Sequence, residues 1–156
     1  MWYAVLIACL SVVLAKPEYM PRKLCKDVDK AQCTLRNVFV DPCTSGSGFC
    51  ILKRNKSYTV SLDLPGFWAC MNVPPLKLAI SADVDGSGNF TTSIKTPVNA
   101  CNMLYCPLQT EERRIFDVSL MLDKRASGKF PVKVKMWNED NESQACCVTF
   151  NVKVSK

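Results

Sequence analysis

Residues 99–108 read Asn-Ala-Cys-Asn-Met-Leu-Tyr-Cys-Pro-Leu, and the rest of the chain is best understood outward from this stretch. Four residues separate Cys101 from Cys106, a spacing that suits a short disulfide-closed loop. Pro107 then directs the chain out of that loop. An alternating apolar segment follows at 115–122, so the loop is predicted to lead into a strand of a sheet.

A second cysteine pair, Cys43 and Cys50, also precedes an alternating segment. The Ser/Gly-rich residues between these two cysteines are predicted to form a turn.

Strict alternation of apolar and polar residues dominates the chain. It predicts strands with one buried face, because successive side chains of a strand point to opposite sides. Turn signals such as Pro65-Gly66 and Asp85-Gly-Ser-Gly-Asn89 separate them, and no amphipathic helix of usable length occurs. About seven short strands predict an all-β, immunoglobulin-like antiparallel β-sandwich. The predicted strands cover residues 36–40, 57–64, 76–84, 90–94, 115–122, 130–136 and 147–154.

The N-terminal residues 1–15 are apolar or small and carry no charged side chain. They are predicted to be a secretory signal peptide, which leaves residues 16–156 as one domain of a secreted protein. Its predicted location is extracellular, with an endosomal or lysosomal location as the alternative. A membrane anchor is the alternative, but the run is shorter than the ~20 residues that a span needs.

Nine of the ten cysteines lie after this segment and are predicted to form disulfides in an oxidising compartment. The chain contains no histidine, which removes the commonest zinc ligand, so we expect no metal site and no cofactor. Because nine is an odd number of cysteines, at least one thiol is left free or paired with another chain. Asn-x-Ser/Thr triplets at Asn55, Asn89 and Asn141 predict glycosylation.

The net charge of +6 comes from scattered basic pairs such as Arg113-Arg114 and Lys124-Arg125. Such a surface favours anionic lipid head groups or membranes, although a solvated outer face of a sheet is the simpler explanation. Nucleic acid is not expected, because the chain has no basic–aromatic array.

Catalysis is not expected either. Without histidine there is no Ser-His-Asp or Cys-His pair. Asp83 and Asp85 lie close together in the sequence, but at a strand end and a turn where nothing raises either pKa for acid–base work.

Taken together, the cysteines and strands resemble the ML lipid-recognition domain, the family of the Niemann–Pick type C2 sterol carriers, the group 2 mite allergens and the endotoxin co-receptor of Toll-like receptor signalling. The segments that carry the resemblance are C-K-D-V-D from Cys25, V-D-P-C…C at Cys43 and Cys50, N-A-C-N-M-L-Y-C-P-L from Asn99, K-S-Y-T-V from Lys56 and C-V-T-F-N-V from Cys147.

The resemblance implies three disulfides: Cys43–Cys50, Cys101–Cys106 and Cys25–Cys147. Cys33 and Cys146 are credible substitutes in the last pair, and a fourth bridge among Cys33, Cys70 and Cys146 stays open.

The resemblance also implies an apolar cavity between the sheets that binds a sterol, fatty acid or related lipid in a monomeric carrier protein. The alternative function is innate-immune recognition, in which a microbial, endotoxin-like lipid is presented to a receptor. From alternation alone, a dry core is the simpler interpretation. The resemblance implies that Tyr58, Val60, Phe130, Pro131 and Trp137 line this cavity, although Trp137 is out of phase with the inward residues of its strand. Together with inward residues of the predicted strands, the implied lipid-binding residues are Tyr58, Val60, Leu62, Leu78, Ile80, Phe116, Val118, Leu120, Phe130, Pro131, Val132, Val134, Trp137, Val148 and Phe150.

Overall fold

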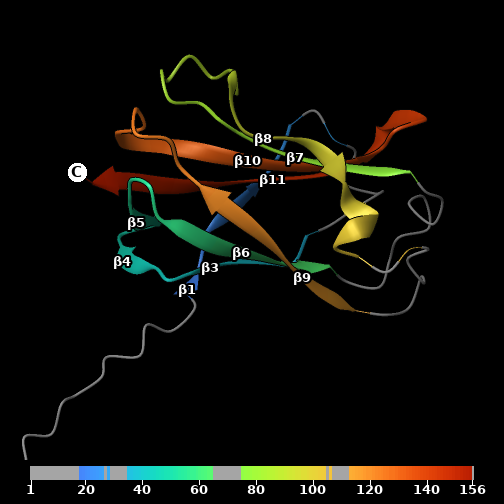
Figure 1. Ribbon diagram of the computed structural model, residues 1–156, viewed down its shortest axis with the longest axis horizontal. Helices are drawn as coiled ribbons and strands as arrows, with labels where there is room; N and C mark the ends of the chain where they lie inside the picture. Colours follow the sequence, from blue (N-terminus) through green and yellow to red (C-terminus); the bar gives the residue numbers. More distant parts are fainter. Residues whose placement is uncertain are drawn as a thin grey trace, which may run out of the picture.

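Two β-sheets packed face to face make up the computed structural model, in which residues 18–26, 28, 35–64, 75–104, 106 and 113–155 are described (Figure 1). The predicted signal segment, Cys33 and Cys70 lie outside these residues. The strands are β1 (Glu18–Tyr19), β2 (Arg22–Leu24), β3 (Asn37–Asp41), β4 (Thr44–Gly46), β5 (Phe49–Lys53), β6 (Ser57–Leu64), β7 (Leu76–Ala82), β8 (Thr92–Asn99), β9 (Arg114–Met121), β10 (Gly128–Asn138) and β11 (Asn141–Ser155), with one 3₁₀ helix, η1 (Ala100–Asn102).

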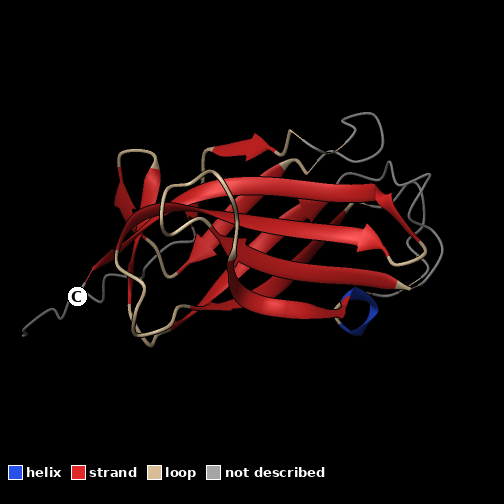
Figure 2. Cartoon of the chain, turned by 90° about the horizontal axis from the view of Figure 1, so that it is seen from above, coloured by secondary structure: helices blue, strands red, loops and turns tan. Residues whose placement is uncertain are grey.

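The smaller sheet has the order β1-β3-β6-β9, and the larger has the order β4-β5-β11-β10-β7-β8, with β2 added against β11. The long strands of the larger sheet run side by side along the molecule, and η1 lies at one end (Figure 2). The all-β sandwich that the alternation predicts is therefore confirmed.

Alternation determines which side chains enter the core. In β9 the buried residues are Phe116, Val118 and Leu120, and in β10 every second side chain from Phe130 onward is buried. These faces pack against each other because burying apolar side chains releases them from water, at about 25 cal/mol per Å². Aliphatic side chains such as Val60 and Ile80 have no exposed surface at all.

The larger sheet departs from the antiparallel prediction at one pair, because β5 runs parallel to β11. After β3 the chain leaves the smaller sheet, and the segment predicted as a Ser/Gly turn forms the hairpin β4–β5 at the edge of the larger one. The run Phe49-Cys-Ile-Leu52, with Cys50 and Leu52 buried, carried the signal for this missed strand.

Several other boundaries also differ from prediction, and two of them lie beside features described below. β7 ends at Ala82, so Val84 is not an inward strand residue but lies exposed in the following loop. β8 continues to Asn99, whose side chain accepts a hydrogen bond from the Cys101 backbone N–H (2.9 Å) and caps η1.

Three disulfides have both partners described: Cys25–Cys147, Cys43–Cys50 and Cys101–Cys106, the pairs that the family resemblance implies. Cys146 is disulfide-bonded as well. Cys25–Cys147 spans 122 residues, whereas the other two span seven and five.

We predict that replacing Cys25 and Cys147 together by serine lowers the free energy of unfolding by about 5 kcal/mol, because the bridge restricts the longest loop of the unfolded chain. Replacing Cys101 and Cys106 should cost about 2 kcal/mol on the same basis. Urea denaturation of the two double variants measures both values, and equal losses would contradict the loop-length argument.

The buried carboxylate of Asp63 in β6 contacts side chains from both neighbouring parts of the smaller sheet, at the end nearest η1. The Asp63 carboxylate is fully buried and accepts hydrogen bonds from Arg113 Nε (2.8 Å) and Nη2 (2.9 Å) and from Asn37 Nδ2 (2.9 Å). Arg113, then Asn37, hold the pKa of Asp63 below its ordinary value of 3.8, against the opposing effect of burial. This contact therefore adds stability above pH 3.8 and loses it as the pH falls through the lowered folded-state pKa.

We predict that Arg113→Ala lowers the free energy of unfolding at pH 7 by about 1–3 kcal/mol, because it leaves a buried carboxylate short of two donors. The difference from the parent protein should shrink as the pH falls below 3.8, because the contribution of the Asp63 contact to stability is lost there. Arg36→Ala is the control. The Arg36 backbone N–H donates to the Asp63 carbonyl, a bond that the substitution keeps, and the Arg36 side chain acts on the Asp63 carboxylate only through its charge. An equal loss in both variants would exclude the proposed role of Arg113.

Candidate functional site

A cavity of about 350 Å³ lies between the two sheets, where the strands β7 and β9 end and β8 and β10 begin. Its walls come from both sheets: Ala82, Val84, Thr92, Ser93, Ile94 and Phe130 from the larger sheet and its loop, and Met121, Leu122, Asp123, Arg125 and Ala126 from β9 and the turn that follows it. Since η1 follows the far end of β8, the cavity and the Cys101–Cys106 loop lie at opposite ends of the sandwich.

The cavity has an apolar floor and a polar rim. Ala82, Leu122 and Phe130 are buried and belong to the core. Asp123 and Arg125 are exposed at the rim, together with Met121, which is 64% exposed. A site of this kind holds a molecule that has an apolar body and a polar end, because only the body loses its contact with water.

Backbone hydrogen bonds fix the rim. The Asn55 N–H donates to the Leu122 carbonyl (3.3 Å), and the Ala126 N–H donates to the Asp123 carbonyl (3.1 Å). The second bond closes the turn that presents Arg125. On the opposite wall, the Asp83 N–H donates to the Pro131 carbonyl (3.1 Å) where β7 ends.

The structure brings thirteen of the fifteen implied lipid-binding side chains into the buried core. Of these, Phe130 alone lines the described cavity. Tyr58 lines a second hollow of about 290 Å³ with Pro42, Thr44, Ile51, Lys53, Lys56 and Ser57, and its hydroxyl accepts from the Lys53 N–H (2.6 Å). The others pack against one another behind these hollows.

Pro131 and Trp137 are the two exceptions, and their expected place inside the sandwich is corrected. Both occupy the odd positions of β10, which point away from the core, whereas Val132, Val134 and Met136 point into it. The Lys135 ammonium group lies 5.4 Å from the centre of the Trp137 ring on the outer face. Trp137 lies on the outer face because it is an odd number of residues from the inward side chains of β10, such as Val132 and Met136.

Sequence reasoning missed most of the cavity lining. Ala82 and Leu122 were predicted to point inward, but nothing marked them as lining a hollow. Ala126 and Arg125 lie in the turn between β9 and β10, where alternation gives no information about burial, and Ile94 lies near the start of β8, where only a short strand was predicted. Small side chains at a strand end, such as Ala82 and Ala126, were the available signal, because they leave space that a larger residue would fill.

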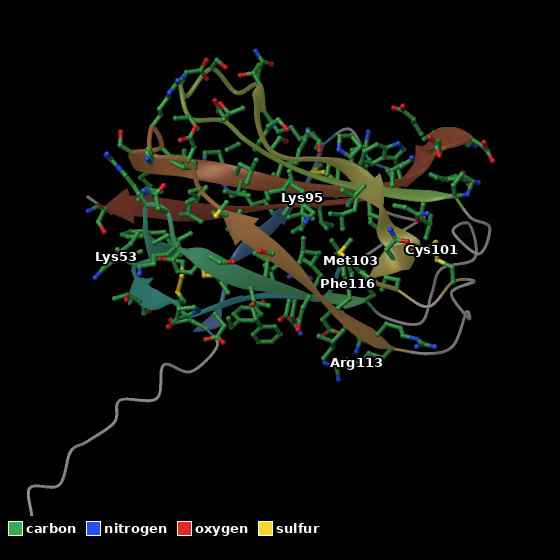
Figure 3. The ribbon with its side chains drawn as sticks, in the orientation of Figure 1. Lys53, Lys95, Cys101, Met103, Arg113 and Phe116 are labelled. Atoms are coloured by element: carbon green, nitrogen blue, oxygen red, sulfur yellow. A yellow bond between two sulfur atoms is a disulfide. The ribbon has the colours of Figure 1, made fainter. Side chains whose placement is uncertain are left out.

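The end of the sandwich near η1 carries both inward-facing apolar side chains and an exposed arginine. Met103 and Phe116 lie between the sheets near η1, whereas Arg113 lies at the outer edge there and Lys53 lies toward the opposite end (Figure 3). Met103 packs against the core, and Phe116 is buried.

Positive charge collects on the outer face of the larger sheet. Three of its lysines lie over aromatic rings: Lys129 lies 4.4 Å and Lys153 6.0 Å from the Phe49 ring centre, and Lys133 lies 4.8 Å from that of Phe90. The outer face of the smaller sheet carries Asp117 and Ser61, which hydrogen-bond to each other (2.5 Å).

Fold and site together define a class: a disulfide-bridged, two-sheet β-sandwich with a partly apolar hollow between its sheets. The ML domain family matches residues 19–154 of the chain. The chain therefore belongs to the ML domain family.

An MD-2-related lipid-recognition protein of Manduca sexta is 27% identical over 134 residues, which cover 85% of this chain and 83% of that protein. The crystal structure of a Niemann–Pick type C2 protein from the Japanese carpenter ant superposes with a TM-score of 0.57 at 15% identity, covering 78% of this chain and 91% of that one. Chicken MD-1 complexed with lipid IVa gives a TM-score of 0.45 at 11% identity, covering 86% and 98%.

In the part of the chain that the structure describes, no helix is long and apolar enough to cross a membrane. Within the same residues, no three His, Cys, Asp or Glu side chains come together in a way that could hold a metal ion.

Proposed function

We propose that this protein binds a hydrophobic lipid, a sterol, fatty acid or related molecule, and carries it without chemical change. The observation that carries the proposal is the cavity between the sheets, whose floor is apolar and whose rim presents Arg125 and Asp123. Its volume of about 350 Å³ lies at the small end of the ~300–1,000 Å³ typical of ligand pockets. Membership of the ML domain family supports the same function.

The lipid is proposed to insert its apolar end first. Each buried methylene contributes about 0.8 kcal/mol, so even a short segment of chain in the cavity gives measurable affinity. Phe130 lines the cavity and also belongs to the core; Val132 is the next inward residue along β10, and Leu120, on β9, is the inward residue before Leu122. A longer ligand would reach these residues by moving the Phe130 ring, which makes the implied lipid-binding residues of the core the deeper part of the site.

A secreted, glycosylated product is part of the proposal. Disulfides form and persist in oxidising compartments, and seven of the described cysteines are disulfide-bonded. Asn55, Asn89 and Asn141 are all exposed, as glycan acceptors must be.

We predict that Ala126→Trp lowers lipid affinity by at least about tenfold, or ~1.4 kcal/mol, because the indole fills the cavity from its wall. Ser127→Trp is the matched control, since Ser127 is the adjacent residue, is exposed and does not line the cavity. Displacement of a fluorescent fatty acid and native mass spectrometry of copurified lipid measure the effect. Protein that is always empty and rejects both sterols and fatty acids would exclude the proposed function.

Arg125 tests which lipid class the rim prefers. We predict that Arg125→Gln weakens binding of a fatty-acid anion roughly threefold, the size expected for an exposed ion pair, and leaves binding of an uncharged sterol unchanged. Lys124→Gln in the same turn is the control, because Lys124 does not line the cavity. An equal loss for both lipids would show that Arg125 shapes the rim without recognising a head group. A phosphorylated, endotoxin-like lipid belongs in the same panel, and its selective loss in Arg125→Gln would favour immune recognition over sterol carriage.

A further inference from the structure

The loop between β7 and β8 carries oxygen-bearing side chains at every second position. It reads Asp83-Val-Asp85-Gly-Ser87-Gly-Asn89, which is the spacing of the first half of a calcium-binding loop of the D-x-D-x-S-G type. Hard divalent cations such as Ca²⁺ are bound by carboxylate, carbonyl and hydroxyl oxygens. Neither lipid binding nor the fold requires this pattern.

Hydrogen bonds curl the loop around its own oxygen atoms. Gly88 N–H donates to Asp83 Oδ2 (2.9 Å), and Ser87 N–H donates to Asp85 Oδ1 (3.1 Å). Asn89 N–H donates to Ser87 Oγ (3.2 Å). Gly86 and Gly88 have φ angles of +72° and +84°, a left-handed backbone that glycine adopts without strain.

One carboxylate oxygen of the loop is buried and has no partner. Asp83 is only 5% exposed, and its Oδ1 makes no hydrogen bond within the described part of the chain. The other oxygen of this carboxylate, Oδ2, accepts the hydrogen bond from Gly88 N–H, so the carboxylate is held against the loop backbone. Leaving a buried carboxylate oxygen unpaired is costly, and a bound ion is one recognised reason for such an atom.

We propose that residues 83–89 form a binding site for a divalent cation of the Ca²⁺ type. The Asp83 and Asp85 carboxylates and the Ser87 hydroxyl are its side-chain ligands, and the Asn89 backbone carbonyl fills the seventh position of the loop. Because that position uses the backbone, a glycan on the Asn89 side chain is compatible with the site.

The site is of low affinity. The twelfth position of such a loop normally supplies a bidentate Glu, and here it is Ile94. With two carboxylates and no such Glu, the dissociation constant for Ca²⁺ falls in the ~10⁻⁴–10⁻³ M range of extracellular modules. Val84 lies between the two aspartates and lines the lipid cavity, so a bound cation holds one wall of that cavity in place.

The test is a titration of chelator-treated, ¹⁵N-labelled full-length protein with CaCl₂ to 10 mM, followed by amide resonances at constant ionic strength. The expected result is a saturable shift confined to residues 83–90, with MgCl₂ acting more weakly because Mg²⁺ demands stricter octahedral geometry. Shifts that stay linear to 10 mM, or that appear equally at other exposed carboxylates, would overturn the proposal.

Variants assign the ligands. Asp85→Asn, at an exposed position that does not threaten folding, should weaken Ca²⁺ binding about tenfold, and Asp83→Asn should do so at least as strongly because the charge nearest the cation is lost. Asp123→Asn is the matched control: it removes a carboxylate from the same cavity rim but lies outside the loop, and should change the affinity less than about twofold. Unchanged binding in Asp85→Asn would exclude the site even if Asp83→Asn proved unstable.

Discussion

Everything in this structure depends on two apolar sheet faces that pack against each other. The inner residues of β6 and β9 on one side and of β7, β10 and β11 on the other form one continuous core, and most have no contact with water. At about 25 cal/mol per Å², this burial is the main term that opposes the conformational entropy of a chain of 156 residues. The charged and hydroxyl-bearing residues of the outer faces contribute much less, since exposed polar contacts are worth little.

Because the two sheet faces pack against each other along the strands, the cavity lies at an end of the sandwich. Along the strands the inward side chains are buried and belong to one core cluster. Where β7 and β9 end, alternation stops and the chain turns through small and polar residues, so the two sheets no longer fill the space between them. The cavity and the aspartate-containing loop both lie there. At the other end, the ion pair between the buried Asp63 carboxylate and the exposed Arg113 side chain lies at the edge of the smaller sheet instead.

The burial of residues in strictly alternating segments could be predicted from the sequence. The placement of residues after the chain changes direction could not. Leu120 and Val132 could be assigned to the core from the sequence because their neighbours alternate. β5 could not be placed beside β11, because a crossover from one sheet to the other leaves no local pattern, and its parallel pairing is set by the route of the chain. Trp137 shows the limit of a resemblance: the matching residue type was present, but its phase in β10 places it on the outer face. The cavity itself arises from missing volume, which a list of residues does not reveal.

The disulfides explain how a packed core remains compatible with a ligand. Cys25 and Cys147 tie the segment after β2 to β11, within the larger sheet, and Cys101–Cys106 closes a loop beside η1. Cys43–Cys50 secures the crossover at an edge. None of these three bridges links the inner face of one sheet to that of the other. These three bridges restrict the unfolded chain, and the contact between the inner faces beside the cavity comes from side-chain packing, which is non-directional. On the proposed function, a ligand that displaced Phe130 would exchange one set of apolar contacts for another.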